Sequence, residues 1–213
     1  PAAASAPSFE LSLNDAAEFD TNFFGSGGNA KNIVFVVEAD GSIISDYPQI
    51  VNELGKTLRS MTEKQRFSII VFDGEGTKQT PSRNLERATA DAKAKALKWL
   101  APNAGNVVTT RTGNPVNALE RAFRLKPDLI FLLSQNLYNP GRSQYELERE
   151  EIITAVTRGS RGGIVVNTIE FNDLDKLAFD AQGKKVRLTL MEEIAEITGG
   201  EYLAVTTNVL PDE

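Results

Sequence analysis

Two patterns of apolar residues alternate along the chain. One is a short run of consecutive apolar residues, and such runs are typical of strands buried on both faces of a sheet. The other is a longer stretch in which apolar residues recur every three or four positions, as on one face of an amphipathic helix. The runs predict strands at 33–37, 67–72, 129–134, 163–171 and 201–205. The helical periodicity predicts helices at 43–61, 85–100, 114–125, 144–157 and 188–197.

Strand and helix alternate throughout, and this order predicts parallel strands joined by right-handed crossover helices. We therefore predict an α/β fold with a doubly wound sheet covered by helices on both faces. Two short segments, 9–13 and 78–81, are predicted as edge strands. The glycine-rich residues 25–28 precede a strand, whereas a phosphate-binding loop follows one, so they are interpreted as a turn.

Amino-acid composition excludes several classes of function and of chemical site. The chain has 213 residues, a net charge of −6 and a pI of about 4.9, which argues against nucleic-acid binding because that needs a basic face. It contains no Cys, so disulfides and thiol chemistry are excluded. It contains no His, which removes the usual general base and the common zinc sites. Any metal must therefore be held by oxygen, which favours magnesium, calcium or manganese.

The ends of the chain differ in composition from its centre. Residues 1–7 are small and Pro-rich, and we expect a linker, the remainder of a removed signal or anchor, or a recombinant end. We predict an N-terminal linker with an edge strand at 1–31, one domain at 32–206 and a tail at 207–213. No apolar run approaches the roughly 20 residues of a membrane span. We expect an extracytoplasmic or membrane-tethered protein with no span of its own in this chain.

Carboxylates and a hydroxyl follow the first predicted core strand. Glu38, Asp40 and Ser42 lie where strand 33–37 ends, and open α/β sheets bind ligands at the carboxyl ends of their strands. Such an oxygen-rich loop suits a hard cation. An acid–base pair of the glycosidase kind is the enzymatic alternative. Neighbours two residues apart at a strand end are more typical of ligands or ion-pair partners, and no nucleophile–base arrangement is evident, so we predict no enzyme activity.

An ordered set of segments resembles a von Willebrand factor type A domain over residues 32–205. The resemblance rests on 33–42, 67–72, 112–119, 125–135, 164–169 and 191–202. It is clearest in Leu-Lys-Pro-Asp-Leu-Ile-Phe-Leu-Leu-Ser at 125–134 and Ile-Ala-Glu-Ile-Thr-Gly-Gly-Glu-Tyr at 194–202. It implies a mostly parallel sheet with one antiparallel edge strand. It also implies a metal-ion-dependent adhesion site, where a carboxylate from the partner completes the metal shell.

The first loop of that implied site departs from the pattern of the family. The family has Asp-x-Ser-x-Ser after the first strand, and this chain has Glu38 and Asp40 at the first two of these positions. Ser42 alone matches. The longer side chain of Glu38 is expected either to push a metal outward or to reach a backbone N–H.

The other two loops of the implied site depart as well. The Thr of the middle loop aligns with Gly113, and Thr112 is one residue away. The Asp after the fourth strand is replaced by Gln135, which removes an acidic ligand and offers an amide. Arg111, in the middle loop, is expected to take the place of the cation beside Glu38 and Asp40, because buried carboxylates require compensation.

These departures lead to two hypotheses. In the first, the chain is a non-enzymatic protein-interaction or assembly domain with a degenerate, metal-free site and no cofactor. Arg111 and Tyr138 are then the partner-binding candidates, and strand addition allows a homo-oligomer or filament. In the second, magnesium or calcium recruits an acidic group of a partner protein. The ligand set implied by that alternative is Glu38, Asp40, Ser42, Thr112 and Gln135.

Overall fold

The computed structural model of the chain describes residues 19–39, 43, 45–73, 76–107, 114–135, 145–171, 184 and 188–205, with the backbone alone at 145–148. The predicted strand at 9–13 lies outside these residues. The division into 1–31, 32–206 and 207–213 stays a prediction.

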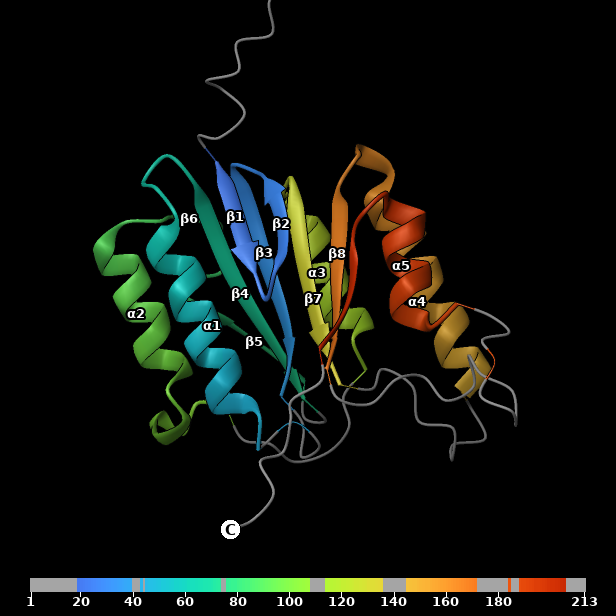
Figure 1. Cartoon of the computed structure of the whole chain (residues 1–213), viewed down its shortest axis with the longest axis horizontal. Helices are drawn as coiled ribbons and strands as arrows, with labels where there is room; N and C mark the ends of the chain where they lie inside the picture. The colour runs from blue at the N-terminus through green and yellow to red at the C-terminus, as the bar shows by residue number, and fades with distance from the viewer. Residues whose placement is uncertain are drawn as a thin grey trace, which may run out of the picture.

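One mixed sheet forms the centre of the molecule, and a separate hairpin lies in front of it (Figure 1). The seven-stranded sheet has the order β5-β4-β3-β7-β8-β9, and β6 also pairs with β4. Its parallel strands are β3 (Asn32–Glu38), β4 (Arg66–Asp73), β7 (Leu129–Ser134), β8 (Val165–Phe171) and β9 (Tyr202–Val205). The antiparallel strands beside β4 are β5 (Gly76–Thr80) and β6 (Glu86–Arg87). The hairpin consists of β1 (Asp20–Phe23) and β2 (Ser26–Asn29).

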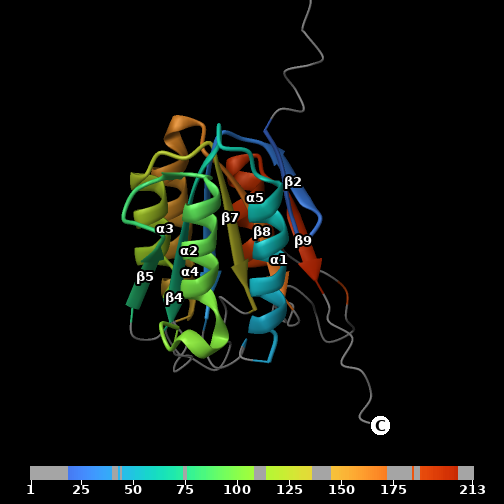
Figure 2. The ribbon, with the colours of Figure 1, turned by 90° about the vertical axis from the view of Figure 1, so that its left-hand side faces the viewer.

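Helices cover both faces of the sheet, which confirms the predicted fold class and the antiparallel edge (Figures 1 and 2). One face carries the hairpin with α1 (Tyr47–Ser60) and α2 (Ala90–Leu100). The opposite face carries α3 (Val116–Arg124), α4 (Tyr145–Gly159) and α5 (Leu190–Thr198). A 3₁₀ turn at Pro102–Ala104 follows α2, and another at Ser160–Gly162 follows α4.

Successive side chains of each central strand enter two different cores. In β3, Phe35 and Val37 pack against α1, whereas Val34 and Val36 pack on the face of α3 to α5. All four are 0% or 1% exposed. This alternation explains why the strands read as unbroken apolar runs, since a strand with two buried faces has no polar side.

The structure corrects two sequence-based interpretations. Residues 25–28 were interpreted as a turn, and the turn ends at Gly25, because Ser26–Asn29 is strand β2, which pairs in register with β1. The helix predicted at 85–100 begins only at Ala90, because Glu86–Arg87 pairs with β4 instead. The Thr89 side chain accepts a hydrogen bond from the Ala92 N–H and caps the helix there.

Aromatic contacts fix the hairpin on the sheet. The Phe23 ring is fully buried and lies edge-on to Phe35 and Phe131, with ring centroids 5.3 and 5.7 Å away. Asn167, in β8, donates its amide hydrogens to the Ser26 hydroxyl and the Gly27 carbonyl, both at 2.9 Å. The same side chain accepts the Glu201 N–H at 3.0 Å, so it joins the hairpin to the start of β9.

Substitution of Gly200 tests the close packing between β8 and the segment that precedes β9. A Cβ at this position would lie 2.1 Å from the Val166 carbonyl oxygen, and the backbone cannot move away cheaply. We expect Gly200→Ala to lower the free energy of unfolding by about 2–3 kcal/mol in urea denaturation. Gly162→Ala, where nothing lies within 4 Å, is the control and should change it by less than about 0.5 kcal/mol. Equal effects of the two substitutions would contradict the packing described.

Candidate functional site

The carboxyl ends of three neighbouring strands bring polar side chains together at one edge of the core. Val37 pairs with Leu133, and Ser134 pairs with Glu170, so Glu38, Ser134 and Glu170 follow one another across β3, β7 and β8. All three are 4% exposed or less. Side chains of strand residues alternate between faces, and the parity of these three positions places them on the face of α3 to α5.

Glu38 is bound by groups of β7 and the residue that follows it. Its Oε2 atom accepts hydrogen bonds from the Ser134 hydroxyl at 2.5 Å and from the Gln135 backbone N–H at 3.0 Å. Hydrogen bonds of this kind stabilise the charged form of a carboxylate and offset the cost of burying it. The bond to a backbone N–H that was predicted for this longer side chain is present.

Gln135 contributes in two different ways to the site. Its backbone N–H donates a hydrogen bond to Glu38. The residue lies just beyond the end of β7 and is partly buried. Its Oε1 atom is buried and has no hydrogen-bond partner among the residues the structure describes. Such an amide oxygen can coordinate a hard cation. It can equally accept a hydrogen bond from another segment of the chain or from a partner.

Most of the remaining predicted site residues lie outside the described part of the chain. These are Asp40, Ser42, Arg111, Thr112 and Tyr138. Their roles as metal ligands, as a substitute cation or as partner contacts therefore stay predictions. Within the described part, no group of three or more Asp, Glu, His or Cys side chains is arranged to hold a metal. Glu38 and Gln135 together do not make a divalent-cation shell, which needs about six oxygen ligands.

A second buried acid was missed from the sequence. Glu170 Oε2 accepts hydrogen bonds from the Tyr202 hydroxyl at 2.8 Å and from the Thr189 hydroxyl at 3.2 Å. Burial in the first place, and then the Glu170 carboxylate, raises the pKa of Tyr202 and so favours the protonated phenol that donates to Glu170. The signal in the sequence was an acid placed directly between two apolar residues, Ile169 and Phe171.

Thr189 connects this acid to the adjacent helix. It is the N-cap of α5, and its side chain and that of Glu192 form a reciprocal capping box. The hydroxyl that caps the helix also donates to Glu170. The start of α5 and the end of β8 are therefore held together next to the Glu38 cluster.

Asp73, at the end of β4, is a further acid that the fold buries. Its position just beyond the apolar run 67–72 predicts a solvated loop charge, as does that of Glu75, yet Asp73 is only 4% exposed. Its carboxylate accepts the Gly76 N–H at 3.0 Å and lies 3.7 Å from the Lys78 ammonium. It therefore closes the turn between β4 and β5. Glu75, predicted with it, lies outside the described residues.

The fold is that of a von Willebrand factor type A domain, as comparison with solved structures shows. A protein described as von Willebrand factor type A from Catenulispora acidiphila superposes with a TM-score of 0.56 at 16% identity, covering 84% of this chain and 40% of that one. The pilus adhesin SpaC from Lactobacillus rhamnosus GG gives 0.57 at 13% identity, covering 83% and 28%. The PilB minor pilin from Streptococcus sanguinis gives 0.53 at 12% identity, covering 83% and 56%.

These likenesses concern the fold alone, because the identities are low. The chain spans less than two thirds of the length of each of these structures. No protein-family model matches the sequence, and no curated protein matches it. Among the described residues, no helix is both long and apolar enough to cross a membrane.

Ser134→Ala tests the hydrogen bonding of the buried carboxylate. The substitution removes the shorter of the two bonds to Glu38 Oε2 and leaves a buried charge under-solvated. We expect the free energy of unfolding at neutral pH to fall by about 1.5–3 kcal/mol, measured by urea denaturation. The control is Ser45→Ala, an exposed serine whose hydroxyl contacts only its neighbour Asp46 in the described structure. A loss no larger than that of the control would contradict the role assigned to Ser134.

Proposed function

We propose that this chain is a non-enzymatic protein-interaction or assembly domain of von Willebrand factor type A fold, whose adhesion site works without a metal ion. The observation that carries the proposal is the bonding of Glu38. Glu38 stands at the position of the first implied metal ligand. One of its carboxylate oxygens accepts hydrogen bonds from the Ser134 hydroxyl and from the Gln135 backbone N–H. These donors supply compensation that a cation would otherwise provide.

Three substitutions in the sequence support the same proposal. A hydroxyl ligand is replaced by Asp40, an acidic ligand by Gln135, and the threonine of the middle loop aligns with Gly113. We propose that Arg111 supplies the remaining positive charge and that Tyr138, which follows β7 in the sequence, contacts the partner. A guanidinium suits this position because it binds carboxylates through several N–H groups at once.

The structural neighbours support an interaction role. Two of them are described as a pilus adhesin and a minor pilin, and this chain shares their fold over most of its length. On that basis we propose a cell-surface or otherwise extracytoplasmic location and a protein partner. The acidic net charge argues against nucleic acid as the partner.

A second candidate function keeps the cation. It is favoured by one observation, the buried Gln135 Oε1 without a hydrogen-bond partner in the described structure. In this alternative, magnesium or calcium is held by Gln135 together with Glu38, Asp40, Ser42 and Thr112, and an acidic group of the partner completes the shell.

Calorimetric titration separates the two candidates. We expect no saturable heat when magnesium, calcium or manganese is added to millimolar concentration, because the described oxygen atoms do not form a cation shell. Glu38→Gln should leave that flat titration unchanged. Saturable binding by the unmodified chain that disappears in Glu38→Gln would reject the metal-free proposal and establish the alternative.

A further inference from the structure

One edge of the sheet concentrates positive charge in an otherwise acidic protein. Strand β5 is the last strand on its side, and it has α3 next to it on one face and α2 on the other (Figure 2). A cavity lies against each face of the strand, and Gln79 lines both. In the part of the chain that the structure describes, no strand pairs with the outer edge of β5. The strand therefore offers a backbone edge between two recesses, which is the arrangement used in recognition by strand addition.

The recess on the α3 side is cationic. It has a volume of about 690 Å³, and its charged lining residues in the described structure are Lys78, Arg83, Arg121 and Arg124. Lys78 lies 3.7 Å from Asp73, and Arg124 lies 3.9 Å from Glu120. Arg83 and Arg121 form no ion pair with any residue in the described part of the chain. Two guanidinium groups are thus available to an incoming acid.

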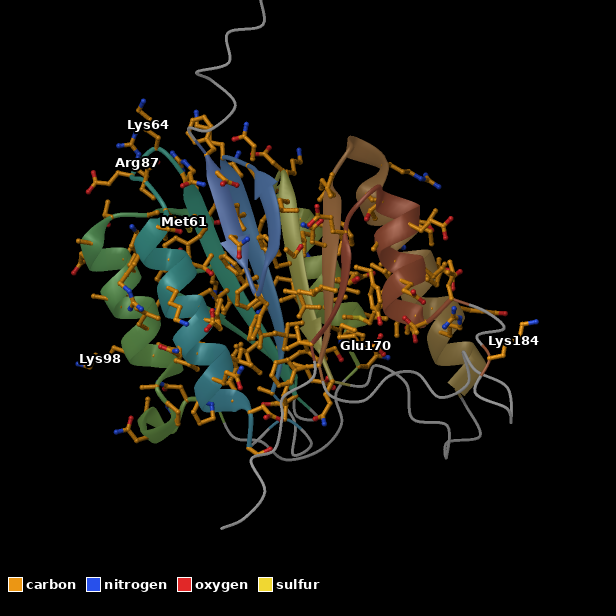
Figure 3. All side chains as sticks on the ribbon, in the orientation of Figure 1. Met61, Lys64, Arg87, Lys98, Glu170 and Lys184 are labelled. Atoms are coloured by element: carbon orange, nitrogen blue, oxygen red, sulfur yellow. The ribbon has the colours of Figure 1, made fainter. Side chains whose placement is uncertain are left out.

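The recess on the α2 side combines apolar surface with further positive charge. Its volume is about 560 Å³, and Trp99, Pro81 and Ala104 line it together with Lys95 and Lys98. Figure 3 shows Lys98 extending outward from α2. A strand added to β5 would alternate its side chains between these two recesses, because successive residues of a strand point to opposite faces.

The N-terminal segment of the chain has the matching pattern. Residues 1–18 contain Glu10, Asp15 and Glu18 and no Lys or Arg. Phe9 and Leu11 alternate with Glu10, so an extended backbone places apolar and acidic side chains on opposite faces. Apolar residues would face the Trp99 recess, and Glu10 would face Arg83 and Arg121.

The opposite edge of the sheet fits an acidic strand poorly. It is formed by β9, which follows Glu201 directly and runs beside the buried Glu170. The difference in charge between the two edges therefore favours β5 as the edge to which an acidic strand is added.

We propose that residues 8–15 of one copy add as a strand to the β5 edge of a second copy, with Glu10 paired to Arg83 and Arg121. This inference rests on the proposed assembly function and names the partner, a second copy of the chain. Such a contact joins two different surfaces, so repetition gives an open chain of copies rather than a closed dimer.

Two full-length variants test the contact by complementation. Leu11→Pro disables the donor segment, because proline removes a backbone donor and the apolar side chain is lost. Arg83→Glu with Arg121→Glu disables the acceptor edge without touching a buried apolar residue. In sedimentation velocity the unmodified chain should associate with rising concentration. Each variant alone should remain monomeric, and an equimolar mixture should form a dimer, since only one productive contact remains per pair.

A charge exchange provides the matched control. Glu10→Arg alone should weaken association at least about tenfold, and combining it with Arg83→Glu and Arg121→Glu should restore most of that loss. Circular dichroism verifies that every variant is folded.

The outcomes separate this inference from the proposed function. A monomeric unmodified chain at all concentrations, or a mixture of variants that stays monomeric, overturns the strand-addition contact and leaves metal-free binding of another partner standing. Association that persists in both variants also overturns it. Association that requires magnesium or calcium and is abolished by a chelator overturns the proposed metal-free function instead.

Discussion

A carboxylate buried at the carboxyl end of the central strand is the constraint around which this site is organised. Glu38 is 1% exposed, and a charge in that position must be compensated. The Ser134 hydroxyl and the Gln135 N–H provide compensation from the neighbouring strand. Their positions depend on the register of β3 with β7, so the electrostatics of the site and the pairing of the sheet support each other.

The same edge of the core contains a second acid satisfied in a similar way. Glu170 is bound by Tyr202 from β9 and by Thr189 at the start of α5. On the other face, Asn167 of β8 binds Ser26 of the hairpin and the Glu201 N–H just before β9, so the hairpin, β8 and the start of β9 are joined. The described ends of the strands are consequently held by internal hydrogen bonds. This arrangement suits a preformed binding surface.

The fold was predictable from the sequence because strands buried on both faces appear as runs of consecutive apolar residues. Runs such as 33–37 and 129–134 are wholly apolar, and the stretches between them have helical periodicity. The hairpin was missed because Ser26–Asn29 consists only of small or polar residues, and its pairing is specified by tertiary contacts of Phe23 rather than by local propensity. The start of α2 was predicted too early because Glu86 and Arg87 favour a helix in isolation, whereas the edge of β4 recruits them.

The site was less predictable than the fold. The sequence identified Glu38 and Gln135 by position, yet it could not identify Ser134 as the donor, because that contact depends on strand register. Glu170 was visible only as an acid between Ile169 and Phe171, and Asp73 was interpreted as a solvated loop charge although it is buried where it accepts the Gly76 N–H. The roles of Arg111 and Tyr138 depend on loop conformation, which local patterns do not specify.

The central claim is that protein donors, rather than a divalent cation, hold the Glu38 carboxylate. Nuclear magnetic resonance of the Gln135 amide during a manganese titration tests it most directly, because this N–H binds Glu38 and a paramagnetic ion at the carboxylate would broaden its signal. The account predicts that the Gln135 signal keeps its position and width at millimolar manganese. Selective loss of that signal at manganese concentrations that leave the amides of α2 unaffected would contradict it.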